Sequence, residues 1–194
     1  MPLVNADRMM LSILPEPTDG FLPDWAARLR DGDLAWMAVA QRGVDSFVAH
    51  ATRQRVPFAV ETVFSHWREL PDGRVESKID RITEMQANGY LVILFFVGLR
   101  SAKASAARVA TRVARGGHAV EPRRLLARFP RTQHAIRAAR GVADAAVLMD
   151  NSRSLAEAFT LCRAELGGAT QYDVRDAGTV HPAIAAWLNI VCPP

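Results

Sequence analysis

The chain has 194 residues, of which 49% are hydrophobic and 23% are charged, and its formal net charge is +4. This composition excludes a long disordered tract and predicts one globular domain over residues 1–194. The longest apolar run, residues 90–99, is too short to span a bilayer, and the first residues lack the regions of a signal peptide. We expect a cytoplasmic protein without a membrane partner, although a secreted effector without a Sec signal would have the same pattern.

Four short apolar runs, at residues 3–6, 58–63, 90–99 and 145–149, predict buried strands because they are β-branched or aromatic-rich and do not alternate. Helical patterns cover residues 33–55, 76–88, a segment N-capped by Ser101, a segment opened by Pro122, residues 154–166 and a segment begun by Pro182. The alternation predicts an α/β fold with a mainly parallel sheet that helices cover on both faces.

Functional residues of parallel sheets follow the carboxyl ends of the strands. Here those positions hold Asn5 and Asp7, residues 61–66, Arg100 and residues 150–152. The two cysteines, Cys162 and Cys192, form no metal or redox motif. We therefore expect no metal-ligand cluster, and we expect buried or incidental thiols in a reducing compartment.

Positive charge is concentrated in residues 108–140, which hold nine arginines and one acid, Glu121. Helical spacing places Arg108, Arg112 and Arg115 on one face before Gly116-Gly117-His118, and Arg124, Arg128 and Arg131 on one face after it. Forked guanidinium groups suit phosphate oxygens. The pattern predicts an arginine-rich helical lid over residues 101–140 that closes on a phosphate-bearing ligand, and a solvated helix face is the alternative.

Several motifs occur in order: "LVNAD" (3–7), "FAVETVFSH" (58–66), the stretch 89–122 with its "GGH", and "MDNS" (149–152). Together they resemble the zeta-toxin-like family of P-loop kinases from Leu3 to about Leu166. The resemblance implies a P-loop kinase-like parallel sheet and transfer of the ATP γ-phosphoryl group, with Mg²⁺, to a hydroxyl of a nucleotide-sugar or similar acceptor. It also implies a possible antitoxin protein as partner.

The resemblance also implies roles for individual residues. Asp7 would be the general base, and Arg112 with Arg128 or Arg131 would neutralise the transferring phosphoryl group. The acceptor would contact Asn5, Glu61, Thr62 and Ser65, and the nucleotide would contact Arg108, His118, Asp150, Asn151 and Ser152. Asp7 could instead be a helix N-cap, Glu61 a buried structural carboxylate and His118 a local hydrogen-bonding residue.

The chain departs from the family in two places. It reads Gly116-Gly117-His118-Ala119-Val120-Glu121-Pro122 where the family often has "GGHDVP", and it contains no G-x-x-x-x-G-K-[ST] loop. The family's loop and its strand immediately precede the "NAD" strand. We therefore expect this chain by itself to be marginally stable and inactive, with a gap or a substitute strand between the strands at 58–63 and 90–99. The alternatives are a non-catalytic nucleotide- or protein-binding relative and, with less support, an arginine-rich nucleic-acid-binding module.

Overall fold

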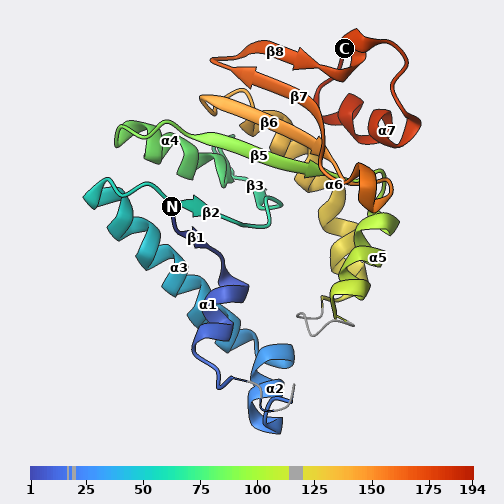
Figure 1. Cartoon of the computed structure of the whole chain (residues 1–194). Coiled ribbons are helices and arrows are strands. Elements are labelled where there is room, and N and C mark those ends of the chain that lie inside the picture. The colour runs from blue at the N-terminus through green and yellow to red at the C-terminus, as the bar shows by residue number, and fades with distance from the viewer. Residues whose placement is uncertain (17, 19–20, 114–119) are drawn as a thin grey trace. The chain divides into compact units, whose positions relative to one another are not determined.

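The structure is a computed structural model that describes residues 1–16, 18, 21–113 and 120–194, apart from the side chain of Arg112. The chain is a mixed α/β protein (Figure 1). It divides into two compact units. The first comprises residues 1–62 together with the segment that begins at Arg112, and the second comprises residues 63–111 and 120–194.

The first unit combines a two-stranded sheet with three helices. Strand β1 (Leu3–Val4) pairs in parallel with β2 (Ala59–Val60). The helices are α1 (Ala6–Ser12), α2 (Asp24–Gly32) and α3 (Leu34–Gln54). Helix α3 begins where the sequence predicts, because the Asp33 carboxylate accepts hydrogen bonds from the backbone N–H groups of Ala35 and Trp36.

The second unit holds the larger sheet, with strand order β5-β6-β7-β8. Its strands are β5 (Ile93–Gly98), β6 (Ala145–Asp150), β7 (Thr160–Leu166) and β8 (Ala169–Asp173), and a separate antiparallel hairpin joins β3 (Trp67–Glu69) to β4 (Val75–Ser77). The helices are α4 (Ile79–Ala87), α5 (Ala102–Val113), α6 (Pro122–Ala139) and α7 (Pro182–Val191), with short 3₁₀ helices at Leu155–Glu157 and Val174–Ala177.

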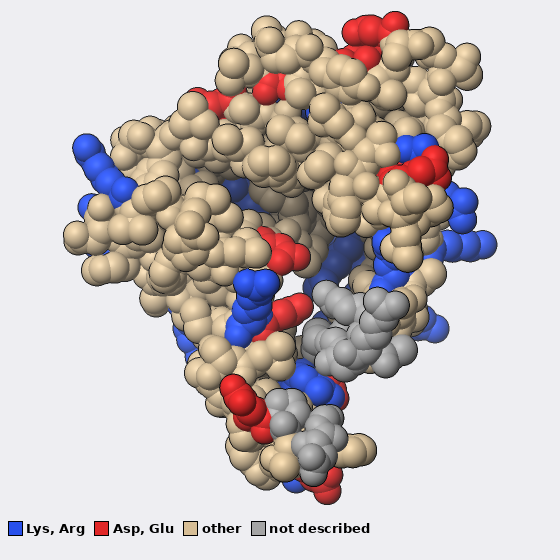
Figure 2. All heavy atoms as spheres, in the orientation of Figure 1, with Lys and Arg blue, Asp and Glu red and all other residues tan. Residues whose placement is uncertain are grey.

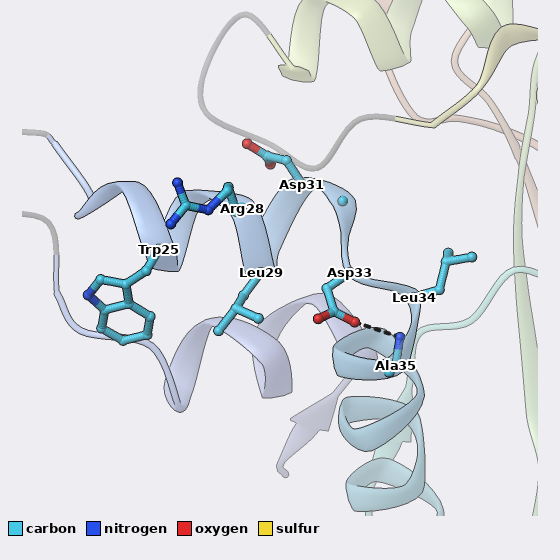
Figure 3. A pocket seen from close by; sticks show the side chains of 8 residues that line it. Trp25, Arg28, Leu29, Asp31, Asp33, Leu34 and Ala35 are labelled. Atoms are coloured by element: carbon cyan, nitrogen blue, oxygen red, sulfur yellow. Dashed lines mark hydrogen bonds between the residues drawn. The ribbon is translucent and has the colours of Figure 1, made fainter.

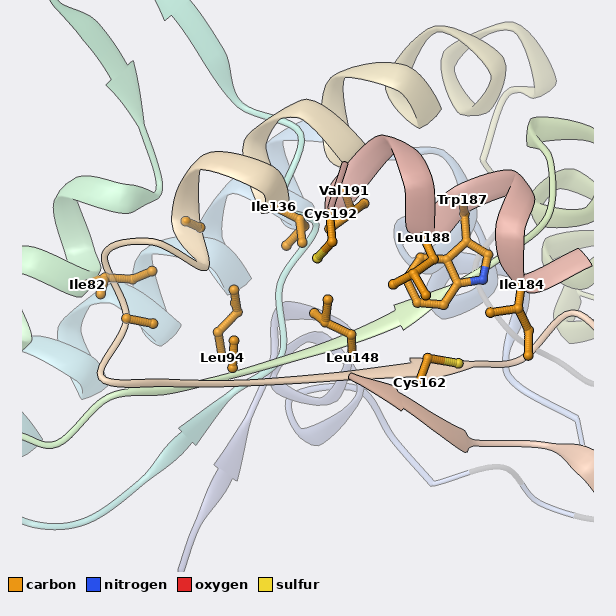
Figure 4. Packing of buried hydrophobic residues seen from close by; sticks show 13 residues of the cluster. Ile82, Leu94, Ile136, Leu148, Cys162, Ile184, Trp187, Leu188, Val191 and Cys192 are labelled. Carbon is orange, nitrogen blue, oxygen red and sulfur yellow. The ribbon is translucent and has the colours of Figure 1, made fainter. Parts of the chain in front are cut away.

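The core of the second unit lies on one face of this sheet. Side chains from α7, among them Trp187 and Leu188, and from α6, such as Ile136, pack on Leu148 and Cys162 (Figure 4). Trp187 is completely buried and makes an edge-to-face contact with Phe96, with ring centroids 5.7 Å apart. Both cysteines are free and buried, and burial raises the pKa of the Cys162 thiol to about 11.

The prediction of a mainly parallel sheet covered on both faces is wrong in two respects. Only β5 and β6 are parallel in the four-stranded sheet, whereas β6–β7 and β7–β8 are antiparallel. The face opposite the core exposes the β5 side chains of Ile93, Phe95 and Val97. The predicted strands at 58–63 and 90–99 correspond to β2 and β5, which belong to separate sheets. Among the described strands none is hydrogen-bonded to both of them, so none acts as the substitute strand.

The predicted helix over residues 154–166 is also wrong, because most of this segment is strand β7. It pairs with β6 on one side and, through a tight turn at Gly167-Gly168, with β8 on the other. Both glycines have positive φ, at 56° and 78°, which suits a two-residue hairpin turn. Long-range pairing here overrides a helical pattern in the sequence. The helix expected over 76–88 begins later, at Ile79, because Glu76 lies in β4.

Three arginines and two carboxylates tie β7 and β8 to the end of α7. Arg163 is hydrogen-bonded to Glu165 and Asp173, Arg175 pairs with Asp173 at 2.6 Å, and Arg140 pairs with Glu165 at 2.7 Å. Arg140 and Arg175 also donate to the carbonyl oxygens of Val191 and Cys192. These bonds satisfy carbonyl groups that the end of a helix leaves without a partner.

Acid should weaken this network. Hydrogen bonds from Arg175 and Arg163 hold the pKa of Asp173 well below its usual value despite its burial. A carboxylate with a lowered pKa stabilises the fold above the usual Asp value of about 4 and loses this effect as the pH falls below it. We expect the stability of the wild type to fall more steeply than that of Asp173→Asn when urea unfolding is repeated from about pH 6 down to about pH 3. Asp176→Asn, at an exposed position nearby, should retain the wild-type dependence.

Candidate functional site

The first cluster of predicted site residues lies at the carboxyl ends of β1 and β2. The parallel register pairs Leu3 with Ala59 and Val4 with Val60, so Asn5 and Glu61 leave the two strands at the same edge. The Asn5 amide donates a hydrogen bond of 2.7 Å to the Glu61 carboxylate. The structure thus brings together two predicted acceptor-binding residues that are 56 positions apart in the sequence.

Asn5 also begins helix α1. Its Oδ1 accepts a hydrogen bond of 2.6 Å from the Arg8 backbone N–H, which makes Asn5 the N-cap. Asp7 lies half-buried in the first turn of α1, so the alternative interpretation of Asp7 as the N-cap is wrong. A carboxylate in a first turn interacts favourably with the helix dipole, which is a structural reason for its presence. Thr62 is exposed directly after Glu61, whereas Ser65 is half-buried and belongs to the second unit.

The second cluster lies at the carboxyl ends of the parallel strands β5 and β6. The Asn151 backbone N–H donates to the Gly98 carbonyl at 3.0 Å, and the Arg108 guanidinium of α5 donates to the Asn151 carbonyl. The Asn151 side-chain oxygen is buried and has no hydrogen-bond partner among the residues described. This contact places the N-terminal part of the predicted lid against the predicted nucleotide loop within the second unit.

Asp150 is the buried centre of this cluster. Its carboxylate accepts hydrogen bonds from Trp187 Nε1 at 2.9 Å, from Ser152 Oγ at 2.6 Å and from the Ser152 backbone N–H at 3.1 Å, and Arg153 Nε lies at 3.4 Å. Burial alone would raise the pKa of Asp150, but these donors outweigh it and lower the pKa. Asp150 and Ser152 therefore have a structural role in anchoring Trp187 and the turn after β6.

Sequence reasoning missed two residues that organise this cluster. Arg153 reaches Glu157 at 2.5 Å and Thr160 at 2.7 Å in addition to Asp150. Trp187 comes from α7, 37 residues further along the chain. No local motif links these residues, because their contacts depend on where α7 packs. A buried Asp at the end of an apolar strand is a signal that some donor must lie nearby.

Helix α6 carries most of the described positive charge of the predicted lid. Its 18 residues include five arginines and no acid, and Pro122 opens it as the sequence predicts. Arg131 is exposed and Arg128 is half-buried, and neither forms an ion pair with a residue that the structure describes. Arg124 pairs with Glu121 at 3.5 Å. Blue side chains gather over the region of α5 and α6 in Figure 2. His118 and the Arg112 side chain lie outside the described part of the chain.

A shallow pocket of about 1020 Å³ lies at the junction of α2 and α3, within the first unit (Figure 3). Its lining includes Trp25, Arg28, Leu29, Asp31 and Asp33. The Asp33 carboxylate caps α3, so it is already engaged. None of the residues predicted to bind a ligand lines this pocket, and we do not assign the candidate site to it.

Over residues 1–16, 18, 21–113 and 120–194, no group of three His, Cys, Asp or Glu side chains could hold a metal ion. Nor, in the same part of the chain, is any helix long and apolar enough to cross a bilayer. Comparison with known proteins found no matching family model, no matching curated protein and no matching solved structure.

Proposed function

We propose that this chain is a zeta-toxin-like, kinase-related domain that binds a phosphate-bearing nucleotide or acceptor but does not transfer phosphate by itself. Helix α6 carries this proposal, because it presents five arginines without a single acid. Arg128 and Arg131 form no ion pair with a residue that the structure describes. Like charges on one helix repel one another, and an anionic ligand that neutralises them would explain their concentration. ATP with Mg²⁺ and a nucleotide-sugar acceptor are the ligands that the sequence resemblance implies.

The arrangement of Asn5 and Glu61 supports the acceptor half of the proposal. Both follow parallel strands at a shared edge, and ligands of α/β sheets bind at the carboxyl ends of strands. Glu61 is exposed and its carboxylate can accept hydrogen bonds from sugar hydroxyl groups in addition to that from Asn5. Asp7, two residues beyond Asn5, would take the proton of an attacking hydroxyl in a complete kinase site.

The proposed lack of transfer is supported by the sequence. A phosphate-binding loop holds the β-phosphate with successive backbone N–H groups, and its lysine reaches the γ-phosphate. The chain contains no G-x-x-x-x-G-K-[ST] motif, and arginine side chains supply charge without that oriented set of backbone donors. We therefore expect binding of the anionic ligand without turnover.

Calorimetry with Mg-ATP and with UDP-N-acetylglucosamine tests the proposal. We expect binding of at least one of them, and the double variant Arg128→Ala/Arg131→Ala should weaken it at least about tenfold, because each charge-assisted hydrogen bond contributes roughly 1.5–3 kcal/mol. Arg137→Ala is the matched control, since Arg137 lies on the opposite side of the same helix and is also exposed.

Three outcomes would contradict the proposal. Phosphoryl transfer by the purified chain would show that the phosphate site lies elsewhere. Equal loss of affinity in Arg137→Ala would show that only the net charge of the helix matters. Failure to bind either nucleotide, together with binding of duplex DNA or RNA that weakens steeply with salt, would favour a nucleic-acid-binding module.

A further inference from the structure

The four-stranded sheet of the second unit has a second face, opposite the α6–α7 core, whose cross-strand paired residues are uncharged and mostly apolar. Cross-strand register defines its members, because directly paired residues point to the same side of a sheet. They are Ile93, Phe95, Val97, Ala145, Val147, Met149, Leu161, Ala164, Leu166, Ala169 and Tyr172. None of these side chains carries a charge, and we call this set the open face.

The open face is large for a surface exposed to water. Phe95 is 63% exposed and Leu166 56%, and Ile93, Val97, Leu161 and Tyr172 are each exposed by at least a third. With side chains of this size, these fractions correspond to roughly 600 Å² of apolar surface, the upper end of what a monomer exposes. The half-buried Ala145, Val147 and Met149 add to it, which brings the area close to the roughly 800 Å² per partner of a standard stable interface.

The shape of the open face complements itself. The central cross-strand row runs Phe95, Val147, Ala164, Tyr172, so that large side chains flank two smaller ones. Along β7, Ala164 lies between the larger Leu161 and Leu166, which form the two sides of a notch. The exposed ring of Phe95 on β5 and the notch at Ala164 on β7 have complementary shapes, and each chain carries both.

We propose that the open face packs against the open face of a second copy of this chain, forming a two-sheet sandwich with twofold symmetry. A twofold axis that runs parallel to β6, midway between the two sheets, places Val147 opposite its own copy and Phe95 over the Ala164 notch of the second chain. The same rotation places the second Phe95 over the first notch, as an isologous interface requires. Packed sheets lie about 10 Å apart, a distance that one layer of such side chains from each sheet fills.

The mass of the chain in solution tests this proposal. Sedimentation equilibrium at about 10–100 µM should give twice the chain mass for the wild type. Phe95→Lys should shift the equilibrium toward the monomer by at least roughly 100-fold, because it would bury an unpaired charge. Leu155→Lys is the matched control, since Leu155 is 92% exposed and lies outside the open face, and it should remain dimeric.

A monomeric wild type would overturn the proposal, as would a dimer that Phe95→Lys leaves intact. Disulfide trapping tests the same interface without Phe95→Lys, in case that variant fails to fold. A mixture of Phe95→Cys and Ala164→Cys chains should yield a cross-linked dimer under mild oxidation, whereas each variant alone should yield much less. The native cysteines, Cys162 and Cys192, are buried and should not compete. A dimer without this cross-link would mean that the two chains meet through another surface.

Discussion

Gly98→Ala should lower the free energy of unfolding by about 3 kcal/mol or more, the upper part of the range for overpacked cores. A β-carbon at Gly98 would lie 2.2 Å from Cε2 of the Trp187 ring and 2.3 Å from Cδ2. The ring has no room to move, because it is completely buried and its Nε1 is held by Asp150. The added methyl group must therefore displace α7 or bend the end of β5.

Urea unfolding followed by tryptophan fluorescence measures this effect. Gly141→Ala is the matched control, because its β-carbon would come no nearer than 3.6 Å to another atom and its φ is not in the left-handed region. We expect the control to remain within about 0.5 kcal/mol of the wild type. A Gly98→Ala variant as stable as the control would show that α7 does not pack on β5 in the way described.

Asp150→Ala should destabilise the second unit by about 3–5 kcal/mol, the range for removing one partner of a buried charged group. The change leaves the Trp187 indole N–H buried without an acceptor and removes the bonds that hold Ser152 in the turn after β6. Arg153 loses its buried partner as well. The expected result is a lower unfolding midpoint with a red-shifted emission of Trp187, since its ring would become more exposed.

The control for this variant is Glu157→Ala, which removes an exposed partner of Arg153 and leaves Asp150 in place. It should unfold close to the wild type, since exposed ion pairs contribute little to stability. If both variants lose the same stability, the important contact is the one between Arg153 and Glu157. Retained stability in Asp150→Ala would show that the indole of Trp187 finds a different acceptor.

The sequence predicts the part of the candidate site that lies directly after the ends of strands. Apolar runs locate β1, β2, β5 and β6, and the polar residues directly after them include Asn5, Glu61 and Asn151. What the sequence could not indicate is which of these side chains are available to a ligand. Asp150 has the sequence context of a binding residue, yet its carboxylate is occupied by Trp187 and Ser152. The donor that occupies it comes from a helix 37 residues away.

The sequence by itself determined the local features of this protein. Asp33 and Ser101 begin helices through bonds to backbone N–H groups within three residues, and Pro122 and Pro182 occupy first turns that need no donor from them. The absence of a phosphate-binding loop and the clustering of arginines in α6 are likewise sequence facts. Each depends only on residues close together in the chain.

Only the tertiary structure decided the direction of the strands, the identity of β7 and β8, and the side of the sheet that is covered. The segment of β7 has a pattern that also suits a helix, and pairing with β6 from a distant part of the chain selects the strand. The apolar run of β5 predicts burial on both faces, but the helices that pack on it cover Leu94 and leave Phe95 exposed. Strand pairing and helix docking join residues far apart in sequence, so their energies are not encoded in any local pattern.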